Sequence, residues 1–279
     1  MKKIALTFAL LLSTVFVFAQ SGSAIRIMKS GAGKPVLFLP GFTSPGTVWE
    51  ETISNLEVER QSHVISYAGF NGIQPIDTPW YATIRKELLQ YIEKENLTNL
   101  SIVGHSMGGN LAVDVAAAVP ERVEKLVLVD AIPCMRELMM PGVAASQIKH
   151  SSPYNQQMLQ MSADDLRKTA GMMAHNMTYR QDKIDLLVQW SLAADRETYV
   201  YGYTDLLKLD LREALKQVKA QTLILGATYP DAKLVMGNFE KQYANLPAKN
   251  IVLAPESKHF IMFDQPEWFF EKVNTFLAK

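Results

Sequence analysis

The chain of 279 residues contains one cysteine, Cys134, and no excess of charge of either sign, because 28 basic side chains balance 28 acidic ones. A single cysteine excludes an intramolecular disulfide and any zinc or iron–sulfur site built from several cysteines. A surface that binds nucleic acid needs an excess of Lys and Arg opposite the phosphates. We therefore expect no nucleic acid as a partner, and the neutral balance suits a small uncharged substrate better.

The sequence also lacks three short motifs that are typical of metal or nucleotide sites. It contains no HExxH zinc motif, no glycine-rich P-loop and no GxGxxG dinucleotide motif. We therefore expect neither a metal nor an organic cofactor. Apolar residues make up 48% of the chain and charged residues 20%, which is the composition of a folded globular protein and not of a disordered one.

Only one long apolar run is present, and it lies at the N-terminus. A positively charged start precedes the run Ile4–Phe18, and Ala19 and Gln20 follow it. This order predicts a secretory signal peptide, residues 1–19, that is cleaved before Gln20. The alternative is an uncleaved anchor helix, but about 15 apolar residues are short for a bilayer span of roughly 20. We therefore expect an exported protein, periplasmic or secreted, with no stable membrane insertion after cleavage.

Short apolar runs alternate with helical patterns along the rest of the chain. Several runs are apolar throughout, as expected of strands that helices cover on both faces. Segment 78–95 has an apolar residue at every fourth position from Trp80 to Ile92, which predicts a helix with one buried stripe. Asp264 is expected to cap the last helix, with Pro266 in its first turn. The alternation predicts an α/β fold with a parallel sheet. The predicted strands are Ile25–Met28, Pro35–Leu39, His63–Tyr67, Leu100–Gly104, Val123–Val129, Gln221–Leu225 and Asn250–Leu253.

The segment from Met135 to about Gln217 interrupts this alternation, because it contains helical patterns and no convincing strand. Eight of the 13 methionines lie between Met135 and Met177, which makes the segment apolar and adaptable. These methionines could fill an ordinary core, but an all-helical insert between two strands favours a lid over a pocket. No linker rich in Pro, Gly or Ser separates two units. We therefore expect one domain, 20–279, with a core of 20–134 and 218–279 and a helical cap at about 135–217.

The strongest functional signal is Gly104-His105-Ser106-Met107-Gly108, which follows a predicted strand and precedes a helical pattern. In a G-x-S-x-G turn the serine lies on strained backbone, so the residues two before and two after it must be small. The turn exposes the serine hydroxyl at the start of a helix, where the helix dipole favours negative charge. Ser106 is therefore the candidate nucleophile, and we interpret its neighbour His105 as structural.

A second candidate element is Pro40-Gly41-Phe42, which follows the predicted strand Pro35–Leu39. A loop at this place can direct a backbone N–H into the space above Ser106. A Pro-Gly sequence is also common in ordinary turns. The loop therefore indicates an oxyanion hole only in combination with the serine motif. We predict that the amides of Phe42 and Met107 form an oxyanion hole.

A serine hydroxyl needs a base to accept its proton, and histidine usually supplies it. His63 begins a predicted strand, and His105 belongs to the serine motif. His150 and His175 lie in the helical insert. His259 stands in the loop between the last predicted strand and the last predicted helix, which places it at the same edge of the sheet as the serine motif. His259 is therefore the candidate base.

These features together resemble the α/β-hydrolase superfamily over essentially all of the mature sequence. The resemblance rests on Gly104–Gly109, on Pro40–Phe42, on His259-Phe260 followed by Gln265–Glu267, and on the helical insert. It implies a doubly wound, mostly parallel sheet of eight strands, with the cap inserted after the sixth strand. It also implies a triad in the chain order serine, acid, histidine. Many family members carry His-Gly where this chain has Pro-Gly, which still leaves a backbone donor in place.

The acid of this triad has two candidates. Family members usually carry Asp after the seventh strand, commonly three residues beyond its closing glycine, but here Gly226 is followed at that place by Tyr229. Asp231 lies two residues further on and would need a rearranged loop. The superfamily also uses the end of the sixth strand, where this chain has Asp130. Asp130 needs no loop distortion to reach His259, so we favour it and keep Asp231 as the alternative.

The predicted function is a serine hydrolase that cleaves carboxylic esters of small to medium apolar acyl groups through an acyl-enzyme on Ser106. A serine at this position argues against dehalogenase or epoxide hydrolase chemistry, which needs a carboxylate nucleophile. An amide or aminopeptidase-type hydrolase is an alternative, and it would need an acidic pair such as Asp164 and Asp165 to bind a free amine. This pair looks more like the capped start of a helix. A non-catalytic member that binds a small molecule is the alternative from another class.

Overall fold

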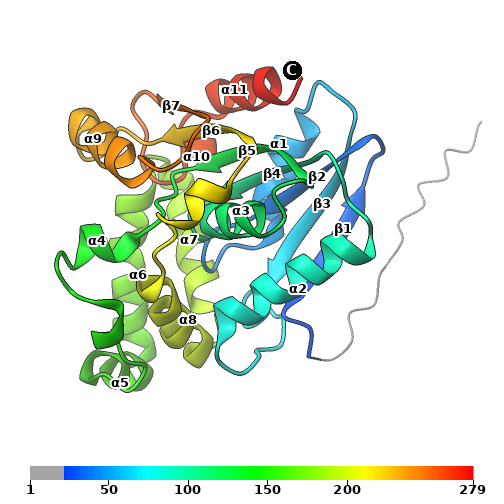
Figure 1. The fold of residues 1–279 in the computed structure, drawn as a ribbon. Helices are drawn as coiled ribbons and strands as arrows, with labels where there is room; N and C mark the ends of the chain where they lie inside the picture. The colour runs from blue at the N-terminus through cyan, green and yellow to red at the C-terminus, as the bar shows by residue number, and fades with distance from the viewer. Residues whose placement is uncertain (1–21, 279) are drawn as a thin grey trace, which may run out of the picture.

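The computed structural model describes residues 22–278, which form a central β-sheet with helices on both faces and a helical region at one end (Figure 1). The predicted signal peptide, residues 1–19, lies outside the described residues. The sheet has seven strands in the order β1-β3-β2-β4-β5-β6-β7. The strands are β1 (Ile25–Ser30), β2 (Lys34–Leu39), β3 (Arg60–Tyr67), β4 (Leu100–His105), β5 (Val123–Val129), β6 (Gln221–Gly226) and β7 (Lys249–Leu253).

All neighbouring strands are parallel except β1, which runs antiparallel to β3. The predicted doubly wound, mostly parallel sheet is therefore confirmed. The expected number of eight strands is wrong for the described residues, because only one apolar run, that of β1, precedes β2 there. The helical insert consequently follows the fifth strand of this sheet and not a sixth.

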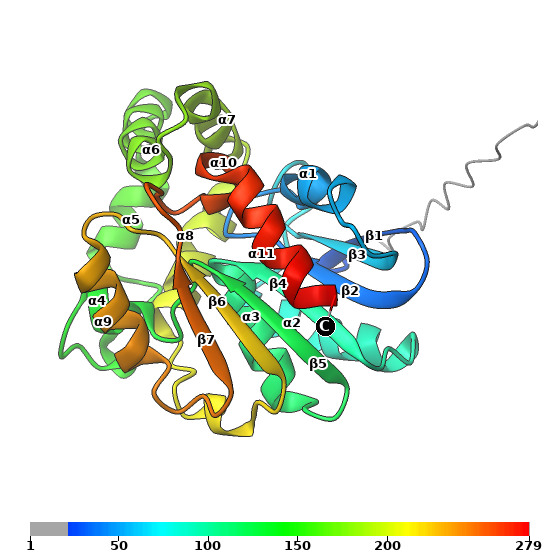
Figure 2. The same cartoon turned by 90° about the horizontal axis from the view of Figure 1, so that it is seen from above.

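Both faces of the sheet are buried, which explains why the strand sequences are apolar throughout. Leu37 and Leu39 of β2 share a core with α2 and α3, whereas Val36 and Phe38 face the opposite side and share a core with α11. Figure 2 shows α11 lying across the sheet on this second face. The helices outside the insert are α1 (Glu50–Ser54), α2 (Trp80–Lys94), α3 (Met107–Ala118), α9 (Ala232–Gln242), α10 (Ile261–Asp264) and α11 (Pro266–Ala278), and a 3-10 turn spans Gly46–Trp49.

The segment that joins β5 to β6 is helical and lies over the loop that follows β2. A Cβ atom at Gly202 would lie 3.1 Å from the ring of Trp80 and 3.2 Å from that of Phe42, so α8 packs tightly on both. The elements of this insert are α4 (Met135–Met139), α5 (Pro153–Gln160), α6 (Ala163–Met177), α7 (Gln181–Leu192) and α8 (Arg196–Lys208), with 3-10 turns at Ala145–Gln147 and Ala214–Gln217. No helix within residues 22–278 is both long and apolar enough to cross a membrane.

Candidate active site

Ser106 lies on the tight turn between β4 and α3, with backbone angles φ 53° and ψ −120°. A positive φ is strained for a residue with a side chain, so the surrounding contacts must hold it there. A Cβ atom at Gly104 would lie 2.3 Å from the carbonyl oxygen of Gly108, and one at Gly108 would lie 2.1 Å from that of Leu39. Because only glycine fits at either position, the two glycines of the serine motif permit the turn.

The loop Pro40–Phe42 lies directly against Ser106. A Cβ atom at Gly41 would be 2.8 Å from Nδ1 of His105 and 3.4 Å from Cβ of Ser106. A larger residue at position 41 would therefore push the loop away from the serine. The absence of a side chain here lets the loop backbone come close to the hydroxyl.

Met107 and Phe42 belong to the linings of the two cavities that meet at Ser106. Neither of their backbone amides donates a hydrogen bond to an acceptor among residues 22–278. Met107 is the first residue of α3, where amides have no partner within the helix. The Phe42 ring is held by Phe70 and Trp80, with ring centroids 4.9 and 5.7 Å away. The structure thus leaves both predicted oxyanion donors free next to the serine.

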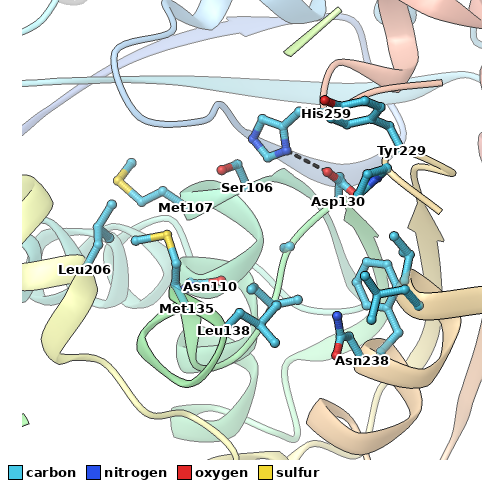
Figure 3. A pocket seen from close by; sticks show the side chains of 16 residues that line it. Ser106, Met107, Asn110, Asp130, Met135, Leu138, Leu206, Tyr229, Asn238 and His259 are labelled. Carbon is cyan, nitrogen blue, oxygen red and sulfur yellow. Dashed lines mark hydrogen bonds and ion pairs between the residues drawn. The ribbon is translucent and has the colours of Figure 1, made fainter. Parts of the chain in front are cut away.

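Asp130 and His259 form a short contact beside Ser106. Nδ1 of His259 lies 2.6 Å from Oδ2 of Asp130, and Figure 3 shows the Ser106 side chain beside the same imidazole. The other carboxylate oxygen of Asp130 accepts a hydrogen bond of 2.9 Å from the amide of Ala227. The side chains of His259 and Asp130 are only 27% and 18% exposed. The structure therefore places the side chains of Ser106, His259 and Asp130 on the lining of one cavity, with the imidazole and the carboxylate in direct contact.

Asp231, the alternative acid, is engaged elsewhere. Its Oδ1 accepts a hydrogen bond of 2.8 Å from the amide of Leu234 and caps the N-terminus of α9. Tyr229, which occupies the family's usual acid position, is 41% exposed, and its hydroxyl lies 3.4 Å from Oδ1 of Asn176 in α6. The acid that the structure places beside His259 is therefore the one at the end of β5.

His105 is buried directly behind His259. Its Nε2 donates a hydrogen bond of 3.0 Å to the carbonyl of His259, and the two ring centroids are 4.6 Å apart. Because a carbonyl only accepts, this contact places the proton on Nε2. Burial, aided by the neighbouring imidazole, lowers the pKa of His105 well below its usual value, so the ring stays neutral. His105 therefore supports the backbone of His259.

Asp264 connects the loop that carries His259 to the helical insert. The predicted role of Asp264, as a cap of the last helix, does not indicate this connection. One carboxylate oxygen accepts hydrogen bonds from the hydroxyl of Thr178 at 2.6 Å and from the amide of Tyr179 at 2.9 Å. The other oxygen accepts a hydrogen bond of 2.8 Å from the amide of Lys258. Hydrogen bonds to an ionised acceptor are stronger than neutral ones. Asp264 thus joins the end of α6 to the residue that precedes His259.

Lys258 and Phe260, on either side of the candidate base, make further contacts with the same end of α6. The ammonium of Lys258 lies 4.4 Å from the ring centroid of Tyr179 and donates a hydrogen bond to the carbonyl of His175. The amide of Phe260 donates to the carbonyl of Met177 at 2.9 Å. The loop is therefore fastened to the insert on both sides of the imidazole.

His63 and His150 have hydrogen-bond partners elsewhere in the fold. Nδ1 of His63, in β3, lies 2.6 Å from the hydroxyl of Tyr91, and burial lowers the pKa of His63 to about 4. Nε2 of His150 lies 2.9 Å from a carboxylate oxygen of Asp205.

The single cysteine, Cys134, is buried. Within the described part of the chain, no group of three or more His, Cys, Asp or Glu side chains could hold a metal ion.

Two cavities meet at Ser106 and His259. The first, of about 290 Å³, lies between α4 and α9 and is here called the α9 cavity (Figure 3). The second, of about 170 Å³, lies under α6, α7 and α8 and is called the cap cavity. Met135 and Leu206 line both cavities. Apolar side chains predominate in both linings, and neither lining includes a Lys or an Arg.

Asp264→Ala is expected to loosen the junction between α6 and the His259 loop, because three donors lose a charged acceptor. Such a loss costs about 1–3 kcal/mol of local stability, which corresponds to about 5- to 150-fold faster hydrogen exchange at the amides of Lys258 and Tyr179. The exposed Asp185, on α7, provides the control variant Asp185→Asn, which should leave both rates unchanged. Wild-type exchange rates in Asp264→Ala would refute this role of the carboxylate.

Relatives of this chain include an esterase and a deformylase. The pimeloyl-(acyl-carrier protein) methyl ester esterase of Aeromonas salmonicida (strain A449) is 25% identical over 275 residues, which cover 91% of this chain and 100% of the relative. The N-formylmaleamate deformylase of Pseudomonas putida is 23% identical over 257 residues, which cover 88% of this chain and 90% of the relative.

Solved structures share the fold over nearly the whole chain. An esterase (EaEST) from Exiguobacterium antarcticum superposes with a TM-score of 0.76 at 20% identity, covering 91% of this chain and 96% of the other. A hydrolase from Pseudomonas aeruginosa PA01 gives a TM-score of 0.78 at 18% identity, covering 96% and 100%. Residues 36–272 match the family described as the alpha/beta hydrolase family, a span that includes Ser106, Asp130 and His259. The chain belongs to the alpha/beta hydrolase family.

Proposed function

We propose that this hydrolase cleaves carboxylic esters of small to medium apolar acyl groups through an acyl-enzyme on Ser106. The observation that carries the proposal is the 2.6 Å contact between Asp130 and Nδ1 of His259, beside the serine. A serine hydroxyl is a weak nucleophile until a base accepts its proton. His259, oriented by Asp130, is suited to be that base, and the similarity to an ester hydrolase of matching length supports the reaction class.

The proposed reaction begins when Nε2 of His259 accepts the proton of Ser106 while Oγ attacks the carbonyl carbon of the ester. Asp130 keeps the other ring proton on Nδ1 and stabilises the imidazolium that forms. The imidazolium then donates its Nε2 proton to the alkoxide oxygen as the carbon–oxygen bond breaks, which leaves the acyl group on Ser106. Water attacks this acyl-enzyme through the same relay and releases the carboxylic acid.

The amides of Phe42 and Met107 donate to the negative oxygen that develops on the attacked carbonyl. Met107 opens α3, so the positive end of the helix dipole adds to its effect. Loss of one such donor typically costs about 2.7–4 kcal/mol of transition-state stabilisation. The close approach of Gly41 to Ser106 keeps one of these donors near the nucleophile.

The two cavities favour a small, neutral and largely apolar substrate. Their linings contain no Lys or Arg, so a substrate carboxylate or phosphate would be buried there without a cationic partner. Burial of an unpaired charge is strongly unfavourable. In the cap cavity, Leu187, Trp190 and Phe260 offer apolar surface for a short acyl chain.

An aminopeptidase-type activity has less support. Asp164 and Asp165 lie in the first turn of α6, both exposed, and Asp165 is hydrogen-bonded to Ser162 and Lys168. Neither carboxylate lines the α9 cavity or the cap cavity, so the pair is not available to a free amine at the serine.

Ser106→Ala should abolish hydrolysis of p-nitrophenyl acetate and p-nitrophenyl butyrate, because Ser106 supplies the attacking oxygen in the proposed reaction. The expected loss in kcat is about 10³-fold or more, measured as release of p-nitrophenolate. Ser54→Ala, at an exposed serine of α1, is the matched control and should retain wild-type turnover.

Turnover that survives in Ser106→Ala would contradict the assignment of the nucleophile. If the wild type shows neither turnover nor labelling by a fluorophosphonate probe, the hypothesis of a serine hydrolase is refuted. The alternative of a non-catalytic protein that binds a small molecule then remains.

Asp130→Asn should lower kcat by about 10⁴-fold, because an amide no longer holds the imidazole in the required tautomer. Asp231→Asn should keep kcat near the wild-type value, since Asn also caps a helix and Asp231 is engaged at α9. Steady-state kinetics on p-nitrophenyl butyrate distinguishes the two variants. If both variants lose only a little of their kcat, and to a similar extent, neither Asp130 nor Asp231 is the acid.

We also propose that the protein is exported after cleavage between Ala19 and Gln20, on the basis of the apolar run Ile4–Phe18 and the small residues that follow it. Mass spectrometry of the protein recovered from the periplasm or medium of an expressing bacterium should find Gln20 at the N-terminus. Exported protein that still carries the apolar run would contradict this cleavage.

A further inference from the structure

Asn110 carries a buried carboxamide that no described residue pairs with. The residue is 7% exposed and lies in the first turn of α3. Its backbone N–H donates to the carbonyl of Ser106 at 3.2 Å, so it stands one helical turn beyond the serine. The side-chain amide forms no hydrogen bond to residues 22–278, and it lines the α9 cavity (Figure 3).

Packing does not explain this amide. A polar group left unpaired in an apolar environment destabilises the fold, and a leucine of similar size would avoid that cost. Most of the other residues that line the cavity, among them Met107, Ile132 and Met135, are apolar. The side-chain nitrogen and oxygen of Asn110 are not among the unpaired polar atoms that are completely buried. The amide is therefore placed to pair with a group that enters the cavity.

The cavity limits what that group is. Apart from the acid–imidazole pair, no charged side chain belongs to its lining, and Asn238 on α9 is the second amide. One helical turn corresponds to roughly 5.4 Å along α3. A ligand atom bound by Asn110 therefore lies only a few bonds from a carbonyl carbon that Ser106 attacks.

We propose that Asn110 determines specificity by binding a neutral hydrogen-bond acceptor of the substrate, a ketone or ether oxygen a few bonds from the ester carbonyl. The carboxamide N–H donates to this oxygen, while the apolar walls enclose the rest of the chain. The oxygen belongs to the acyl chain or to the alcohol, two sources with the same chemistry. This inference rests on the proposed ester hydrolysis and narrows the class of substrate within it.

Two pairs of esters test the proposal. Ethyl levulinate and ethyl pentanoate differ by a ketone oxygen in the acyl chain, and ethoxyethyl acetate and pentyl acetate differ by an ether oxygen in the alcohol. The measured quantity is the ratio of kcat/KM within each pair, followed by acid release in a pH-stat. The wild type should favour the oxygen-bearing ester in one pair, which identifies the side of the ester bond that enters the α9 cavity.

Asn110→Leu should lower that ratio by about 10-fold or more, because the substrate oxygen is then buried without a donor. Asn238→Leu, on the facing helix, is the matched control and should retain most of the preference. If Asn110→Leu does not fold, the smaller variants replace it: Asn110→Ala should lose the preference, and Asn110→Ser, which keeps a donor, should retain part of it.

A wild-type ratio near one in both pairs would overturn the proposal, and so would a preference that persists in Asn110→Leu or Asn110→Ala. Loss of the preference in Asn238→Leu alone would place the binding group on α9 and would equally overturn it. Ser106→Ala separates this failure from that of the proposed function. If Ser106→Ala still hydrolyses all four esters, ester hydrolysis at Ser106 is refuted, whereas an inactive Ser106→Ala with unchanged ratios in the Asn110 variants refutes only the role of Asn110.

Discussion

The arrangement around Ser106 depends on the close approach of α3 to the end of β2. A Cβ atom at Gly108 would lie only 2.1 Å from the carbonyl oxygen of Leu39, so two backbones meet where no side chain fits. Because these contacts involve the backbone, no change of rotamer can relieve them, and they keep Ser106 at its positive φ of 53°. The same approach brings the loop after β2, with the amide of Phe42, to the first turn of α3. Ser106 and the proposed oxyanion donors are thus parts of one rigid unit.

The imidazole is positioned in a different way, by side chains from distant parts of the sequence. His105 holds the carbonyl of His259 and Asp130 holds its ring, and both belong to the sheet side of the site. Asp264 fastens the loop to the insert through Thr178, which lies 86 residues earlier in the chain. The proposed base is therefore held by both the core and the insert, while the serine belongs to the core. A shift of α6 would act on the imidazole and leave the serine in place.

The sequence predicts those parts of the site whose geometry requires particular residues at a few neighbouring positions. The turn at Ser106 needs small residues at fixed offsets, and a parallel sheet brings loops at the ends of its strands to one edge. The sequence favours Asp130 as the acid and leaves Asp231 as the alternative, because the choice depends on whether the loop after β6 uses its carboxylate as a helix cap. The contacts of Asp264 join residues far apart, so no local pattern reveals them. The expectation of eight strands came from the resemblance, and the described chain has only one strand before β2.

The lack of Lys and Arg side chains in both cavities bears directly on the chemistry. In the proposed reaction, negative charge develops on the attacked carbonyl oxygen only in the transition state. The amides of Phe42 and Met107 have no other acceptor in the described chain, so they are free to act on that developing charge. An anionic substrate would compete for these donors before reaction and would reduce the difference between ground state and transition state on which catalysis depends. A neutral substrate leaves the donors to the transition state, and the even balance of 28 basic and 28 acidic residues adds no long-range attraction for anions.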